Sequence, residues 1–246
     1  MTYSPGQDVI RISALIAECL RRRVRDRGAD PLITYYDVNS GERTELSATT
    51  FANWVNKTSN LLVDDLDIAP GDAVTLAVAD AHPGHWVTLI WELACWQVGA
   101  EVQTGRSTPA SVLVTGPDTG WSAPRVTTVV ACSLHPLGLP GPAGTGDVLD
   151  YNLEVRGQAD QFPATRQPED AAAWRDDERT ATQAELVAIT AGPPARRLVV
   201  PIDAWTTAQQ ALVTPLLTGG STVIVSGAAT PEQLGRIRTS ERTTDE

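Results

Sequence analysis

The feature that most constrains this chain is the run 86–98, which is apolar on almost every side. A helix without a polar face has to be buried, and Gly99 directly after the run is a typical helix end. Short apolar runs lie before it at 74–79 and after it at 100–103 and 111–114, as expected for strands buried in a parallel sheet. The alternation predicts a layered α/β fold, with mostly parallel sheets flanked by helices.

The rest of the chain adds further elements to this framework. A helix with apolar residues at helical spacing covers 12–20 and ends in a cluster of arginines before Gly28. The sequence also predicts a hairpin of strands 32–36 and 43–46, a helix after Ser47, strands at 126–132, 186–190, 198–200 and 222–226, a helix over 204–217 and a last short helix. Thr230 and Pro231 are typical of the cap and first turn of that last helix.

We expect one domain over residues 1–238. Two segments, 134–146 and 156–183, are rich in Gly and Pro or in polar and charged residues, which favours irregular surface excursions. The end of the chain, 239–246, is interpreted as a frayed tail.

Charge and cysteine content restrict the possible partners and the compartment. A net charge of −11 argues against a nucleic-acid partner, because phosphate binding requires clustered Lys and Arg. The three cysteines lie in apolar runs, which favours packing over disulfides. No secretory signal and no apolar stretch long enough to span a bilayer are recognisable, so we expect a cytoplasmic protein without a membrane partner, either self-associating or bound to another protein.

Two motifs that could carry chemistry are better explained structurally. His82 and His85 lie near Asp80, but their spacing is weak and they precede a buried helix, so no metal site is predicted. The glycines at 138, 141, 144 and 146 are not followed by a lysine and do not join a strand to a helix, so a loop is favoured over a phosphate cradle. No catalytic residue is predicted.

The turn before the strand at 198–200 is the most informative candidate site. It contains Thr190, Gly192, Arg196 and Arg197, and a turn of small residues followed by cations can hold an anion. The alternative is a tight hairpin with solvent-facing arginines, which the residues taken alone favour.

The order of these elements resembles the N-terminal part of the adenylate-forming superfamily, which includes acyl-CoA synthetases and other AMP-dependent ligases. The matching positions are Leu46, Thr50, Phe51, Trp54, Val55, Asn56, Leu61 and Leu62, then Ile68 to Val74 with Pro70, Gly71 and Asp72, then Leu93 to Val102 with Gly99 and Ala100, and finally Pro215 to Val223 with Gly219 and Gly220. The chain especially resembles a short actinobacterial branch of that superfamily.

The departures from the family pattern bear on activity. The resemblance places the family's phosphate loop on residues 190–192, without its hydroxyls, and places Arg196 or Arg197 near the loop's lysine. The family's catalytic lysine belongs to a C-terminal domain that the chain does not include, and Lys57, the sole lysine, cannot be matched to it. Transition-state stabilisation would lack its main electrostatic group.

These departures favour a truncated, non-catalytic, adenylate-forming-like binding or interaction module, that is a pseudoenzyme without a cofactor. One alternative is a residual binder of ATP, AMP or an acyl group at Thr190, Gly192, Arg196 and Arg197. The other alternative is an acyl-CoA synthetase-like enzyme that a separate, lysine-bearing partner chain completes.

Overall fold

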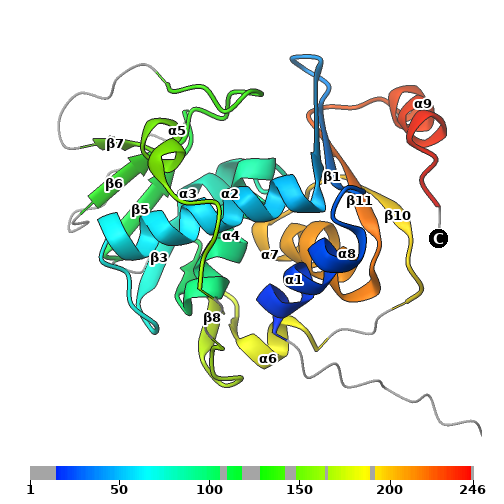
Figure 1. Ribbon diagram of the computed structural model, residues 1–246. Helices are drawn as coiled ribbons and strands as arrows, with labels where there is room; N and C mark the ends of the chain where they lie inside the picture. The colour runs from blue at the N-terminus through cyan, green and yellow to red at the C-terminus, as the bar shows by residue number, and fades with distance from the viewer. Residues whose placement is uncertain are drawn as a thin grey trace, which may run out of the picture.

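Two β-sheets with helices between them form the framework of the molecule (Figure 1). The computed structural model describes residues 15–105, 110–117, 128–141, 148–163, 166–188 and 192–244. The larger sheet has the strand order β7-β6-β5-β3-β4-β8-β9, and the smaller one has the order β10-β11-β1-β2. Within the larger sheet only β9 runs antiparallel to its neighbour, so the prediction of mostly parallel, layered α/β structure is confirmed.

The small sheet joins segments from both halves of the sequence. Its strands are β1 (Pro31–Asp37), β2 (Glu42–Ser47), β10 (Arg196–Val199) and β11 (Ser221–Ser226). β1 and β2 form the predicted antiparallel hairpin, while β11 lies parallel to both β1 and β10. This pairing places β10 at one edge of the sheet.

The large sheet is made of short strands: β3 (Ala73–Leu76), β4 (Glu101–Gln103), β5 (Val112–Thr115), β6 (Thr128–Ala131), β7 (Val148–Asp150), β8 (Ala172–Arg175) and β9 (Thr180–Thr182). Three of these strands, β3, β4 and β5, are almost completely buried. That burial on both faces explains why their sequences are apolar without a regular alternation.

Helices fill the space between the two sheets. α4 (Trp86–Val98) has the predicted bounds, every one of its residues is buried, and Gly99 ends it in the left-handed conformation with φ of 86°. It packs against α2 (Ala48–Asn60), whose N-terminus is capped by Ser47, and α2 continues into the π-helical turn η1 (Leu61–Asp65). A largely apolar helix without an exposed face is stable here because other elements of the protein surround it.

The remaining helices are α1 (Ile16–Arg27), α3 (Ala77–Ala81), α5 (Tyr151–Glu154), η2 (Val155–Gly157), α6 (Gln183–Leu186), α7 (Ala204–Ala208), η3 (Gln209–Val213), α8 (Thr214–Thr218) and α9 (Pro231–Glu241). The predicted helix over 204–217 corresponds to α7, η3 and α8 in succession. Pro215 has no N–H for the carbonyl of Ala211, and the wider π spacing of η3 precedes it. α9 starts with the predicted cap, because Thr230 forms a capping box with Gln233.

Two predicted strands are partly wrong. The strand expected over 74–79 ends at Leu76, and α3 follows it directly. The strand expected over 186–190 is replaced in its described part by the end of α6, which a capping box between Thr182 and Glu185 starts. Short apolar runs do not distinguish a buried strand from a buried helical turn.

The segment 156–183 is not an irregular excursion, because it contains β8 and β9. Trp174 on β8 is completely buried, and its Nε1 donates to Asp176 Oδ2 at 2.9 Å. The strand is too short and too closely flanked by charges for its pattern to be recognised in the sequence. The described part of 134–146, up to residue 141, contains neither helix nor strand, as predicted.

The tail is not frayed over its described part. Thr239–Glu241 form the last turn of α9, and the Thr244 backbone N–H donates to the Arg196 carbonyl at 2.8 Å. Polar segments such as this one are ordered by contacts with distant residues, which local sequence does not reveal.

The three cysteines are buried and unpaired, as predicted. No helix among the described residues has both the length and the apolar character that a bilayer span requires.

Glu92 is the one acidic side chain that α4 carries into the core. It is completely buried, and neither carboxyl oxygen has a hydrogen-bond partner among the described residues. Burial raises its pKa well above the ordinary value of 4.5, so the folded protein holds this group protonated while the unfolded chain ionises it. The folded state therefore loses stability as pH rises above that ordinary value.

We expect Glu92→Met to be more stable than the wild type, with a difference in unfolding free energy that grows with pH by at most roughly 1.4 kcal/mol per unit. Urea unfolding measures this difference between roughly pH 5 and pH 8, where Glu92 is protonated in the folded state and ionised in the unfolded chain. Glu232→Met, on the exposed surface of α9, is the control. A difference that stays constant across this pH range contradicts a protonated Glu92.

Candidate functional site

The two arginines of the candidate turn lie next to each other on β10 but face opposite sides of the small sheet. Side chains alternate along a strand, and Arg196 and Arg197 pair in register with Ser221 and Thr222 of β11. In the described residues β10 pairs in parallel with β11 and the chain before the turn is the end of α6, so the two strands of the predicted tight hairpin are not found there; residues 189–191 lie outside the described part. The two arginine side chains therefore lie in two separate environments, whereas the prediction placed both in one turn that faces an anion.

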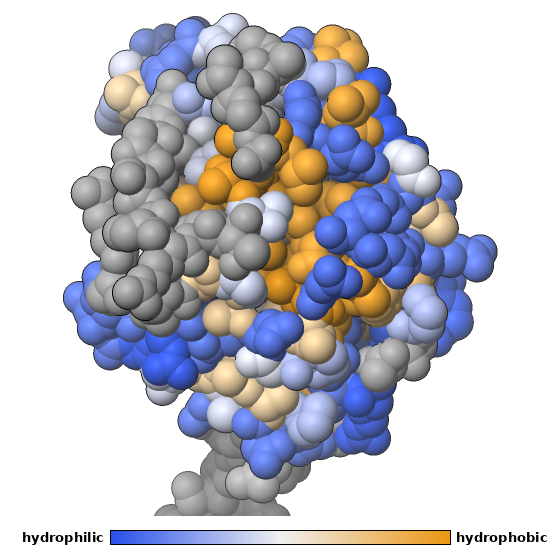
Figure 2. All heavy atoms as spheres, turned by 90° about the vertical axis from the view of Figure 1, so that its left-hand side faces the viewer, coloured by the Kyte–Doolittle hydropathy of each residue, from blue (hydrophilic) through white to orange (hydrophobic). Residues whose placement is uncertain are grey.

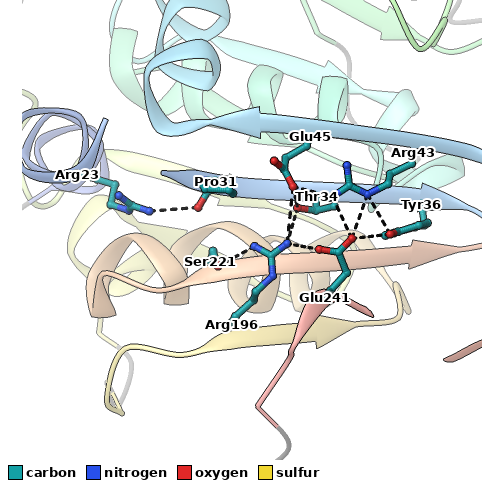
Figure 3. A network of polar contacts seen from close by, with 9 residues as sticks. All are labelled: Arg23, Pro31, Thr34, Tyr36, Arg43, Glu45, Arg196, Ser221 and Glu241. Atoms are coloured by element: carbon teal, nitrogen blue, oxygen red, sulfur yellow. Dashed lines mark hydrogen bonds and ion pairs between the residues drawn. The ribbon is translucent and has the colours of Figure 1, made fainter. Parts of the chain in front are cut away.

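Arg196 is held by groups of the chain itself. Its Nη2 donates to Glu241 Oε2 at 2.5 Å and to Thr34 Oγ1 at 3.0 Å, and its Nη1 donates to Ser221 Oγ at 3.4 Å (Figure 3). Glu45 Oε2 lies 3.8 Å from Nη2. Arg196 is therefore the centre of an internal polar network and does not face solvent as a free guanidinium.

Glu241, on α9, is the carboxylate on which this network converges. Besides Arg196, it accepts hydrogen bonds from Arg43 Nε at 3.0 Å and from the Tyr36 hydroxyl at 2.5 Å. Its side chain is only 9% exposed. Burial alone would raise the pKa of Glu241, but hydrogen bonds from Tyr36, Arg196 and Arg43 outweigh burial and lower it, so the carboxylate is charged at neutral pH.

Arg197 lines a pocket of about 320 Å³ on the other side of β10. The other lining residues come from β10, η3, α8, α9 and the segment after α9: they are Leu198, Val199, Gln210, Thr214, Arg238 and Thr244. No carboxylate belongs to the lining that the structure describes. Two guanidiniums with an amide and two hydroxyls are a donor set that suits an anion such as a phosphate.

Gly192 is the other predicted residue that lies near this pocket. A Cβ at this position would come within 3.4 Å of Arg197 Nη2. Thr190 lies outside the described residues. Of the four predicted ligand-binding residues, the structure therefore brings Gly192 and Arg197 together and separates Arg196 from them.

Sequence reasoning missed the other polar residues of this pocket. Gln210, Thr214 and Arg238 are distant from the turn in the sequence and meet it only through helix packing. A local signal is present for Arg238 alone, because a cation near the end of a helix is favoured by the helix dipole.

His85, the second residue of the histidine pair, has a structural role. His85 caps α4, since its Nδ1 accepts from the Val87 N–H at 3.2 Å, and burial, assisted by His82, lowers its pKa to about 3. Asp80 instead accepts from the Gly105 N–H at 3.0 Å. The described residues contain no group of three metal-ligating side chains.

Two other candidates are also distant from Arg197. Lys57 on α2 pairs with Asp160 Oδ1 at 3.1 Å and donates to the Gln158 carbonyl. Gly138 and Gly141 belong to a loop in which Arg156 donates to the Gly138 carbonyl at 2.8 Å, and the rest of the glycine run, from 142, lies outside the described residues.

Comparisons with known proteins extend this description. No family model matches the chain. It is 31% identical over 223 residues to the "TIGR03089 family protein" of Mycobacterium tuberculosis, an alignment that takes in 87% of this chain and 90% of the relative.

Solved structures share the fold at low sequence identity. The anthranilate CoA ligase AuaEII, solved with anthranoyl-AMP, matches 94% of this chain with a TM-score of 0.71 and 14% identity. An acyl-CoA synthetase of Brucella canis matches 94% with a TM-score of 0.70 and 16% identity. The N-terminal domain of FACL13 from Mycobacterium tuberculosis matches 94% with a TM-score of 0.67 and 15% identity.

The chain spans about half the length of two of these structures, 48% of the ligase and 46% of the synthetase, and 61% of the FACL13 domain. Its two sheets with central helices thus correspond to the N-terminal part of an adenylate-forming enzyme. The solved structures show that the chain has the fold of the N-terminal part of acyl-CoA synthetases and related ligases. Its similarity to the Mycobacterium relative shows that the chain belongs to the TIGR03089 family.

Proposed function

We propose that this chain acts as a binding module of the adenylate-forming fold that does not catalyse acyl-adenylate formation by itself. The observation that carries the proposal is the ion pair between Arg196 and Glu241. The resemblance places Arg196 or Arg197 near the position where the family's phosphate loop has its lysine, and the Arg196 guanidinium is neutralised here by a carboxylate of the same chain. A cation in such a pair is a poor ligand for a nucleotide phosphate.

The sole lysine supports the same proposal. Lys57 pairs with Asp160 and lies on α2, whereas Arg197 lies at the edge of the small sheet. The chain has no other lysine to place near a transferring phosphate. Preorganised positive charge of this kind supplies most of the stabilisation in phosphoryl and adenylyl chemistry.

We expect the purified chain to show no exchange of radiolabelled pyrophosphate into ATP with magnesium and a panel of carboxylic acids, because the cations that would stabilise the transition state are engaged or distant. An acyl-CoA synthetase assayed in parallel provides the positive control. Exchange by the isolated chain contradicts the proposal. Exchange that requires a second, lysine-bearing protein supports instead an enzyme completed by a partner chain.

A second candidate function is the binding of an anionic ligand such as ATP, AMP or acyl-CoA at the Arg197 pocket. The observation that favours it is that Arg197, Arg238, Gln210 and Thr214 line one pocket of about 320 Å³. Gly192 lies beside Arg197, since a Cβ at this position would come within 3.4 Å of Arg197 Nη2. This ligand would be held without being activated.

If this pocket binds a nucleotide, isothermal titration with ATP, AMP or acyl-CoA gives a saturable signal that Arg197→Gln reduces by about tenfold or more, since each lost charge-assisted hydrogen bond costs about 1.5–3 kcal/mol. Arg25→Gln, which removes an exposed arginine of α1, is the matched control. A flat response to all three compounds with magnesium removes this candidate function.

An exposed apolar patch gives the module a surface for protein contact. Figure 2 views the side on which β5, β6 and β7 lie in Figure 1, and apolar residues gather near the middle of that face. Three leucines from this part of the chain are exposed: Leu137 by 76%, Leu139 by 42% and Leu153 by 58%. Exposed apolar surface is typical of association sites, and a second copy of the chain is the partner we propose for this face.

Self-association through this patch predicts a sedimentation coefficient that rises with protein concentration and that Leu137→Glu together with Leu153→Glu returns to the monomer value. Exposed Leu side chains in a dimer interface would be desolvated, and a carboxylate in their place opposes that desolvation. Val63→Glu, at a half-exposed valine of η1, is the control. A monomer at every concentration contradicts self-association.

A further inference from the structure

α9 is attached to the small sheet with little apolar packing. Along Pro231–Glu241, all of which the structure describes, no residue is fully buried. Helices of globular proteins are normally held by an apolar stripe that faces the core, and in α9 this stripe is reduced to Leu234 and Ile237, both only half-buried. Specific polar contacts therefore contribute much of its attachment.

Open spaces on two sides of α9 agree with this loose packing. One space of about 220 Å³ is lined by Gln233, Arg236 and Ile237 of α9 and by Tyr36 and Val38 of the β1–β2 hairpin. The Arg197 pocket lies along α9 as well, at Arg238. The chain enters α9 through Gly227, an exposed residue in the left-handed conformation with φ of 90°.

Two polar contacts hold the end of α9. The Glu241 carboxylate lies among Arg43, Arg196 and Tyr36, and Thr244 donates its backbone N–H and its hydroxyl to the Arg196 carbonyl at 2.8 and 3.2 Å. Figure 3 shows the three donor side chains pointing at Glu241 from strands β1, β2 and β10. The donors belong to the sheet, and only the acceptor belongs to α9.

The charges of the sheet leave this cradle one negative charge short. Arg43 and Arg196 supply two guanidiniums, and Glu45 is the one carboxylate that the sheet contributes to this network, with Oε2 at 2.7 Å from Arg43 Nη2. Glu241 supplies the second negative charge. Two guanidiniums and a phenol hydroxyl on a rigid frame are a donor set that recognises the planar carboxylate group.

We propose that Arg43, Arg196 and Tyr36 form a carboxylate-binding site that Glu241 fills in cis, so that α9 is the lid of a site open to an external carboxylic acid. The external acid and Glu241 compete for the same donors. The apparent affinity for the acid equals the intrinsic affinity multiplied by the fraction of molecules in which α9 is open, and removal of the Glu241 carboxylate raises it. This site does not involve Arg197.

Acetate is the probe for the test, with acetamide as its uncharged counterpart and sodium chloride to keep the ionic strength constant, at neutral pH. In Glu241→Ala, acetate should raise the thermal unfolding midpoint in a saturable manner and acetamide should not. The double variant Arg196→Gln with Glu241→Ala should lose the response to acetate, whereas Arg197→Gln with Glu241→Ala should keep it. Glu232→Ala, which removes an exposed carboxylate of α9 and keeps Glu241, is the matched control and should respond to acetate as weakly as the wild type.

Hydrogen exchange of residues 231–244 in the wild type gives a second measurement, which does not depend on any variant folding. Acetate should increase exchange in this segment several-fold, since it displaces Glu241, and should leave exchange in α4 unchanged. The proposal is overturned if acetate and acetamide act alike on Glu241→Ala, if the Arg196 double variant still responds, or if wild-type α9 exchanges at the same rate with and without acetate. None of these outcomes depends on nucleotide binding at the Arg197 pocket.

Discussion

The structure depends on the complete burial of α4. A helix whose residues are all buried needs neighbours on every side, and α1, α2, β3 and β4 contact it directly. Polar contacts at its C-terminal half hold the large sheet around it, because Trp96 donates from Nε1 to the Ala173 carbonyl at 2.9 Å, and Gln183 donates to the Trp96 carbonyl at 3.2 Å. Burial of this apolar surface is the main favourable contribution to folding, and it fixes the positions of the two sheets.

The candidate site follows from how the small sheet is assembled around this core. β10 lies at a sheet edge, and a strand directs consecutive side chains to opposite faces. Arg196 therefore meets the carboxylate of Glu241, while Arg197 lines a pocket with Gln210 and Arg238. Arg196 forms ion pairs within the chain, and Arg197 lines a pocket together with a second arginine, Arg238.

Much of the fold could be predicted from the sequence, while the site could be predicted only in part. The hairpin of β1 and β2, the helices α2 and α4 and the cap of α9 follow from periodicity and from local signals such as Ser47, Gly99 and Thr230. β8 and β9 were missed, because strands of three or four residues among charged neighbours carry no readable period. Arg197 was identified as a candidate, but its grouping with Arg196 was wrong.

The sequence by itself determined which segments have to be buried and where helices begin and end, because these properties depend on residues within a few positions of one another. Only the tertiary structure decided that Glu241 meets Arg43 and Arg196, that Arg238 joins Arg197, and that a polar tail is ordered against β10. The physical reason is that an ion pair depends on distance in space, and residues 43, 196 and 241 come together only after β2, β1, β11 and β10 have formed one sheet.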